Sequence, residues 1–178
     1  DHVLAKFLLA RVLNLQGRTD DAATLYENAL TFQRLVFGED SGRVSDTMTE
    51  LAQVRLNQNR VEEAERLMAQ ALEISRKSRG DTHYITGYLL SGLAQIHYRQ
   101  GKLSQAEEEI RQSLDIFAAS LPPDHQYVAS AEYVMGEILL ATGRLPDAEA
   151  MLTASMNRWK RTDAPAWRAG RSASALGE

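Results

Sequence analysis

The stretch Leu93–Leu114, LAQIHYRQGKLSQAEEEIRQSL, decides the fold. It contains a large and a small apolar residue, then a glycine followed by a cation, and then an alanine five residues after the glycine. The pattern recurs along the whole chain, and a fixed period of this length is typical of stacked repeats. The copies are 42 residues apart: the turn residues are Gly17, Asn59, Gly101 and Gly143, and the alanines are Ala22, Ala64, Ala106 and Ala148.

Each repeat is predicted to be a pair of helices joined by a tight turn. Glycine suits the turn because it adopts a left-handed conformation without steric cost, and asparagine is the next best residue, as at position 59. An apolar stripe with helical spacing follows each turn. The third copy interrupts its stripe with Glu109, and Ser104 with Glu107 is predicted to form a capping box there. Pro146 suits a first helical position. In the first repeat the stripe consists of Ala22, Leu25, Tyr26, Ala29 and Leu30.

These patterns predict an all-α fold, a solenoid of antiparallel helix hairpins. One hairpin cannot bury its apolar stripe alone, so at least three must stack. We expect a single array over residues 1–178, which we also expect to be a piece of a longer protein. The predicted repeats are approximately 1–38, 39–80, 81–121 and 122–162, with a partial fifth at 163–178.

Composition limits the classes of partner. The 178 residues are 44% hydrophobic and 25% charged, with a formal net charge of −4. A weakly acidic chain without clustered cations argues against nucleic acid and anionic membranes as partners. The chain has no cysteine and no apolar run long enough to cross a bilayer. We therefore expect a cytoplasmic protein.

The repeat pattern resembles the tetratricopeptide repeat, whose usual length is about 34 residues. The 42-residue form is similar to the repeats of kinesin light chain and of many bacterial relatives. This resemblance implies a right-handed superhelix with the first helix of each pair on the concave side. The tail, 163–178, also resembles the repeat region of bacterial signalling proteins such as serine/threonine kinases. The asparagine that precedes the large–small pair in kinesin light chain is missing, however, and so is the Lys/Asn carboxylate clamp of other members. The four positions before the pair are Leu8, Glu50, Gly92 and Val134.

No motif for catalysis, cofactors or metals is recognisable, so we predict a protein that is not an enzyme and has no cofactor. His83 and His125 are one repeat apart, too far for a shared zinc, and are predicted to cap or pack. His97 stands at a core position and is predicted to be a partly buried packing residue. Trp159 and Trp167 are predicted to pack between repeats, with a homodimer contact through the array ends as the alternative.

The predicted binding site is the face of the first helices that points away from the core. Its mixture of aromatic, amide and charged side chains suits a protein or peptide segment. We therefore expect an interaction or sensory part of a larger bacterial protein; the alternative is a self-assembly module that dimerises or stacks through its ends. The predicted groove residues are Phe7, Arg11, Asn14, Asp46, Thr49, Glu50, Gln53, Asn57, Tyr88, Ser91, Gln95, Tyr98, Arg99, Ser130, Tyr133 and Glu137.

Overall fold

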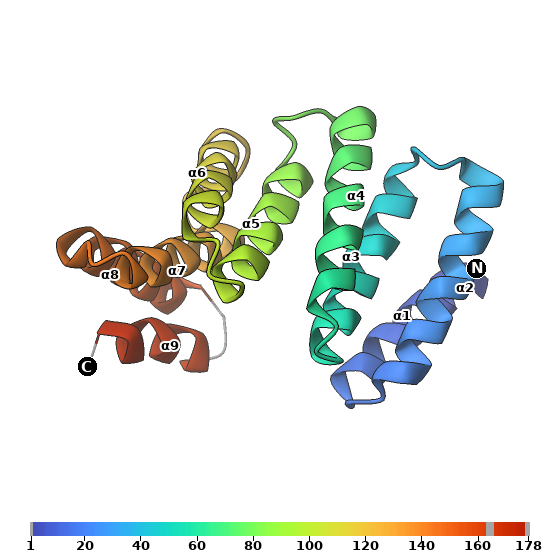
Figure 1. Ribbon diagram of the computed structural model, residues 1–178, viewed down its shortest axis with the longest axis horizontal. Helices are drawn as coiled ribbons and strands as arrows, with labels where there is room; N and C mark the ends of the chain where they lie inside the picture. The colour runs from blue at the N-terminus through green and yellow to red at the C-terminus, as the bar shows by residue number, and fades with distance from the viewer. Residues whose placement is uncertain (1, 163–165, 177–178) are drawn as a thin grey trace. The chain divides into compact units, whose positions relative to one another are not determined.

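The computed structural model describes residues 2–162 and 166–176, with side chains described for 4–162 and 171–176. All regular structure in these ranges is helical (Figure 1). The predicted fold class, an all-α array of antiparallel helix pairs, is confirmed. The helices are α1 His2–Leu15, α2 Thr19–Phe37, α3 Gly42–Asn57, α4 Val61–Arg79, α5 Tyr84–Arg99, α6 Leu103–Ser120, α7 Gln126–Ala141, α8 Leu145–Arg161 and α9 Ala166–Leu176.

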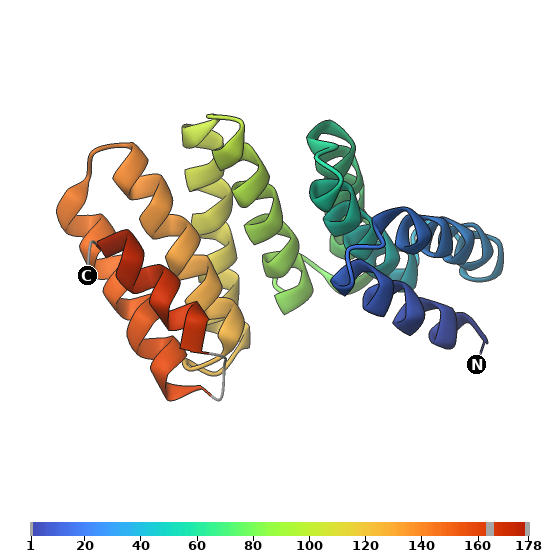
Figure 2. The ribbon, with the colours of Figure 1, turned by 90° about the horizontal axis from the view of Figure 1, so that it is seen from below.

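The chain divides into two compact units, Asp1–Asp81 and Thr82–Glu178. In the first unit, α1 to α4 pack in chain order, and α1 also contacts α3. In the second unit, α5 to α9 pack in chain order, and α5 also contacts α7 (Figure 2). Within each unit, the first helices of consecutive repeats are therefore neighbours.

The turns inside the four pairs have the predicted left-handed residue. The φ angles are 78° at Gly17, 60° at Asn59, 75° at Gly101 and 76° at Gly143. At the first turn, the Arg18 N–H donates to the carbonyl five residues earlier at 2.9 Å, and the turn residue's N–H donates three residues back at 3.1 Å. The other three turns repeat both bonds, which together form the Schellman motif that ends a helix. A local backbone requirement therefore explains why glycine or asparagine recurs at these four positions.

Small residues lie where the two helices of a pair come closest. The alanines five residues after the turns, at 22, 64, 106 and 148, are all 0% exposed. Ala94 of the large–small pair is also fully buried. At the corresponding Gly136, an added Cβ would lie 2.6 Å from the Leu152 Cγ. Larger side chains at these positions would force the helices apart.

The starts of the first helices confirm the capping prediction for two histidines. His83 Nδ1 accepts a hydrogen bond from the Ile85 N–H, and His125 Nδ1 accepts one from the Tyr127 N–H, both at 3.1 Å. Ser41 fills the same position one repeat earlier, and its hydroxyl accepts a bond from Arg43 at 3.3 Å. Each side chain satisfies a backbone donor that the helix leaves free.

The predicted capping box of Ser104 and Glu107 is wrong. Helix α6 already begins at Leu103 and its N-cap is Lys102, so Ser104 lies inside the first turn, too late to cap it. The Glu107 carboxylate instead accepts hydrogen bonds from Arg144 and Arg111. The bond from Arg144, followed by that from Arg111, lowers the pKa of Glu107. Pro146 is the second residue of α8, after Leu145, so it lies one residue beyond the predicted first helical position.

A buried serine hydroxyl donates a hydrogen bond between the two helices of a pair. The serine is on the first helix in one pair and on the second helix in the two later pairs. The Ser45 hydroxyl on α3 donates to the Ala71 carbonyl on α4 at 2.8 Å. In the later pairs the serine is on the second helix: Ser113 donates to the Gly87 carbonyl, and Ser155 donates to the Ala129 carbonyl, both at 2.7 Å. One serine and one small residue therefore occupy this pair of positions in all three repeats.

Candidate functional site

The first-helix face of the first unit lies on α1 and α3, and its polar side chains bind one another. Asn57 Nδ2 donates to Asn14 Oδ1 at 2.9 Å across the two helices. Arg11 Nε lies 3.9 Å from Glu50 Oε1. The Tyr26 hydroxyl donates to the other oxygen of Glu50 at 3.3 Å. Burial, followed by the charge of Glu50, raises the pKa of Tyr26.

The remaining predicted residues of this face differ in whether their side chains already have a partner. The Phe7 ring meets the Tyr26 ring edge-on, with 5.4 Å between centroids. Asp46 Oδ2 is 2.8 Å from Arg79 Nη2, and the Thr49 hydroxyl bonds its own helix. Gln53 is exposed. Most polar groups predicted to hold a ligand here already have an intramolecular partner.

The first-helix face of the second unit lies on α5 and α7 and has more uncommitted groups. Tyr88 is 38% exposed, and its ring centroid lies 5.0 Å from that of Tyr127. On the same face, four predicted residues are exposed or half-buried, and their side chains have no hydrogen-bond or ion-pair partner in the described part of the chain. They are Ser91, Gln95, Arg99 and Ser130.

The other end of this face is an aromatic and charged cluster. The Tyr133 hydroxyl donates to Glu137 Oε1 at 2.9 Å. The Arg171 guanidinium of α9 lies 4.6 Å from the centre of the Tyr133 ring. Burial, followed by the hydrogen bond to Glu137, raises the pKa of Tyr133; burial, followed by the charge of Glu137, raises the pKa of Tyr98. Arg171 was not among the predicted residues.

Sequence reasoning also missed Tyr84 and Tyr127, which extend the aromatic surface. The Tyr84 ring is 37% exposed and stacks on Tyr127, with 6.5 Å between centroids. Tyr127 also touches Phe117, which is fully buried. A signal existed, because Tyr84 and Tyr88 are one helical turn apart and so share a face.

His97 is more deeply buried than predicted, and it has a partner. It is 3% exposed, and its Nδ1 lies 2.6 Å from Glu109 Oε2. Glu109 is the residue that interrupts the apolar stripe of the third repeat. The corresponding positions in the fourth repeat are Leu139 and Met151. A buried polar pair therefore replaces an apolar pair in one repeat.

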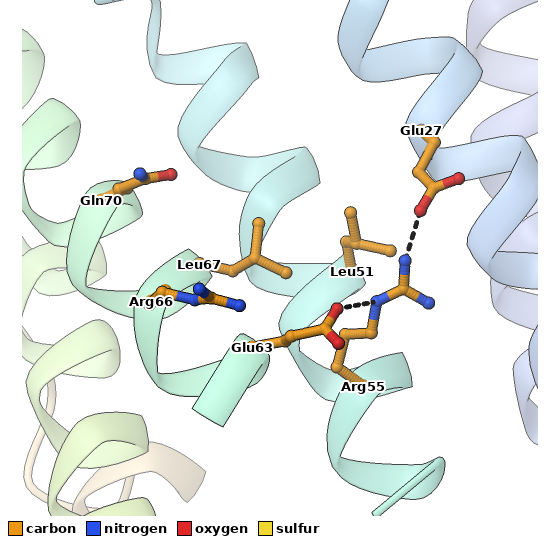
Figure 3. A pocket seen from close by; sticks show the side chains of 7 residues that line it. All are labelled: Glu27, Leu51, Arg55, Glu63, Arg66, Leu67 and Gln70. Atoms are coloured by element: carbon orange, nitrogen blue, oxygen red, sulfur yellow. Dashed lines mark hydrogen bonds and ion pairs between the residues drawn. The ribbon is translucent and has the colours of Figure 1, made fainter. Parts of the chain in front are cut away.

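A cavity of about 360 Å³ opens between α2, α3 and α4 in the first unit (Figure 3). Arg55, which is 7% exposed, reaches Glu27 of α2, and its Nε lies 3.3 Å from Glu63 Oε2. Leu51 and Leu67 form the apolar part of the lining. Both acids and the buried cation of this cavity are thus committed to one ion-pair network.

The described ranges contain neither grouped metal ligands nor a membrane-crossing helix. Over 2–162 and 166–176, no three His, Cys, Asp or Glu side chains gather as metal ligands would. No helix of those ranges combines the length and apolarity that crossing a bilayer requires.

Comparison with solved structures identifies the fold. BtubC (BKLC) from P. vanneervenii superposes with a TM-score of 0.79 at 22% identity, over 92% of this chain and 66% of that one. A putative kinesin light chain from Podosopora anserina gives 0.77 at 21% identity, over 99% and 87%. The apo form of RapI gives 0.79 at 14% identity, over 90% and 57%. The chain thus spans less than two thirds of BtubC and of RapI.

Comparison of the sequence with protein families agrees with this structural similarity. No curated protein matches. The tetratricopeptide repeat family matches residues 3–77 and 43–119 with one model and 129–152 with another. These matches cover most of the chain, and the helix pairs described above follow the same period. The chain therefore belongs to the tetratricopeptide repeat family.

Proposed function

We propose that the chain binds a protein or peptide segment on the first-helix face of its second unit. Tetratricopeptide repeats are generally protein–protein interaction modules and typically non-catalytic. The observation that carries the proposal is the combination on α5 and α7 of half-exposed tyrosines with polar groups that have no internal partner. Tyr88 and Tyr133 supply rigid apolar area, and Ser91, Gln95 and Arg99 supply donors and acceptors for a backbone. We further propose that the array is the interaction or sensory part of a larger bacterial cytoplasmic protein.

A displayed random-peptide library tests the proposal. We expect peptides selected on the chain to lose about tenfold in affinity with Tyr88→Ala or Tyr133→Ala, as aromatic anchors of interfaces do. The matched control is Leu145→Ala, which removes a 62% exposed apolar side chain at the start of α8. It should change affinity less than about twofold. Equal binding by all variants would place the site elsewhere.

A second candidate function, self-assembly through an array end, has one observation in its favour. Leu9 and Val12 on α1 are 50% and 48% exposed. Their counterparts one repeat later, Leu51 and Val54, are 3% and 0% exposed and pack against the preceding pair. The face of α1 that carries Leu9 and Val12 therefore exposes apolar side chains of the kind that consecutive repeats bury against each other.

Sedimentation across a concentration series checks this candidate. If self-assembly occurs through α1, the chain will form dimers or larger species as its concentration rises, and a Leu9→Glu, Val12→Glu variant will remain monomeric because buried charge opposes contact. Association that survives both substitutions would rule out α1 as the contact. A wild-type monomer at high concentration would reject self-assembly.

A further inference from the structure

A second cavity of the first unit, of about 620 Å³, has a largely apolar wall. It lies between α1, the end of α2 and the start of α3. Its volume is in the range of small-molecule sites. Exposed large apolar side chains mark binding surfaces when they gather in one place. Four here are well exposed: Leu4 63%, Val36 52%, Phe32 46% and Phe37 42%.

Three of the four polar side chains that line the cavity are already satisfied. The Thr47 hydroxyl donates to Gln33 Oε1 at 2.8 Å, and both residues are buried. The two oxygens of Asp46 accept bonds from Arg79 Nη2 at 2.9 and 2.8 Å. Asp46 is therefore neutralised and would not repel an anion strongly.

Arg43 is the exception. Its guanidinium lies 4.6 Å from the centre of the Phe37 ring. No carboxylate of the described residues lies within ion-pair distance of it. The repeat pattern does not require a cation at this position, because the later repeats have Ile85 and Tyr127 there. The cavity thus combines apolar walls with one cation that has no opposite charge.

From this combination we propose that the cavity binds a small amphipathic carboxylate. The aliphatic body lies against Phe7, Phe32 and Val36, and the carboxylate meets the Arg43 guanidinium, whose donors suit it. A cationic ligand would face an uncompensated like charge. This site goes beyond the proposed protein-binding function and requires no protein partner.

Calorimetric titration with three probes tests the site: decanoate, decanol and decylammonium, each kept below its aggregation concentration. We expect one decanoate per chain, bound about fivefold more tightly than decanol, which is the upper range for an ion pair near the surface. Decylammonium should bind more weakly than either. Phe32→Ser should weaken both decanoate and decanol, because each buries its chain there.

Matched arginine variants identify the cation. Arg43→Gln should reduce decanoate affinity to that of decanol, and Arg66→Gln, the same change at an exposed arginine of α4, should leave it unchanged. Circular dichroism of both variants checks that the helices remain. The proposal is overturned if decanoate does not bind, if decanoate and decylammonium bind alike, or if the two arginine variants behave the same.

Discussion

Replacing Glu132 by leucine will destabilise the second unit by about 3 kcal/mol, because it leaves the charge of Arg158 largely buried without its partner. Glu132 is 7% exposed. Its two oxygens accept hydrogen bonds from Arg158 Nη2 at 2.6 Å and Nε at 2.9 Å. These bonds join α7 to α8 and are the main reason that the pKa of Arg158 is raised.

The second and third repeats show which apolar residues can replace both Glu132 and Arg158. The corresponding positions are Met48 and Ile74 in the second repeat and Leu90 and Ile116 in the third, all apolar. The double variant Glu132→Leu, Arg158→Ile copies the third repeat into the fourth. We expect its stability to lie within about 1 kcal/mol of the wild type or above it, because a well-packed apolar pair commonly equals a buried ion pair.

Urea unfolding followed by tryptophan fluorescence measures both variants. Of the two tryptophans of the chain, Trp159 is 6% exposed in the second unit and reports on it. The side chain of Trp167, which was also predicted to pack between repeats, lies outside the described residues. Arg161→Ile is the matched control, because this arginine pairs with Asp124 on the surface, where 53% of its side chain is exposed. It should cost less than about 1 kcal/mol. A double variant no more stable than Glu132→Leu alone would mean that the two positions are not compensating.

The architecture was predictable because its determinants are local. The left-handed turn residue and the stripe after it depend only on neighbours along the chain, so 42-residue spacing revealed four helix pairs. The Glu132–Arg158 pair was missed because each stripe was read along one helix. Two positions 26 residues apart become polar together in the fourth repeat, and a comparison of copies across the hairpin would have detected them. His97 and Glu109 give the same signal in the third repeat.

The candidate site was less predictable for a physical reason. All sixteen predicted groove residues are exposed or half-buried, as helical periodicity leads one to expect. Whether a side chain is available to a ligand depends on whether it already forms a hydrogen bond with a side chain of the neighbouring repeat. Asn14 bonds to Asn57, but Ser91 and Gln95 have no bond within the described ranges, although all four are polar residues of first helices. Periodicity alone does not distinguish these cases.

Replacing Phe117 by alanine is expected to cost about 4 kcal/mol, within the range for deleting a buried aromatic ring. The Phe117 side chain is 0% exposed and belongs to the core of the second unit. It packs where Gly87 leaves space, since a Cβ added to Gly87 would lie 2.9 Å from the Phe117 Cε1. Phe117→Leu keeps most of the apolar volume and should cost about 1.5 kcal/mol or less.

The contact between Gly87 and Phe117 makes a reciprocal test possible. In the wild type, Gly87→Ala should destabilise the second unit by about 1–3 kcal/mol through overpacking. In the Phe117→Ala background the closest contact is removed and the Ile116 Cγ2, at 3.1 Å, is the nearest that remains. The same change should then cost less than in the wild type, and the helix preference for alanine over glycine, about 1 kcal/mol, offsets part of that cost. Urea unfolding of the four proteins gives the coupling between the two sites. Equal effects of Gly87→Ala in both backgrounds would show that the Phe117 ring is not the reason that position 87 requires glycine.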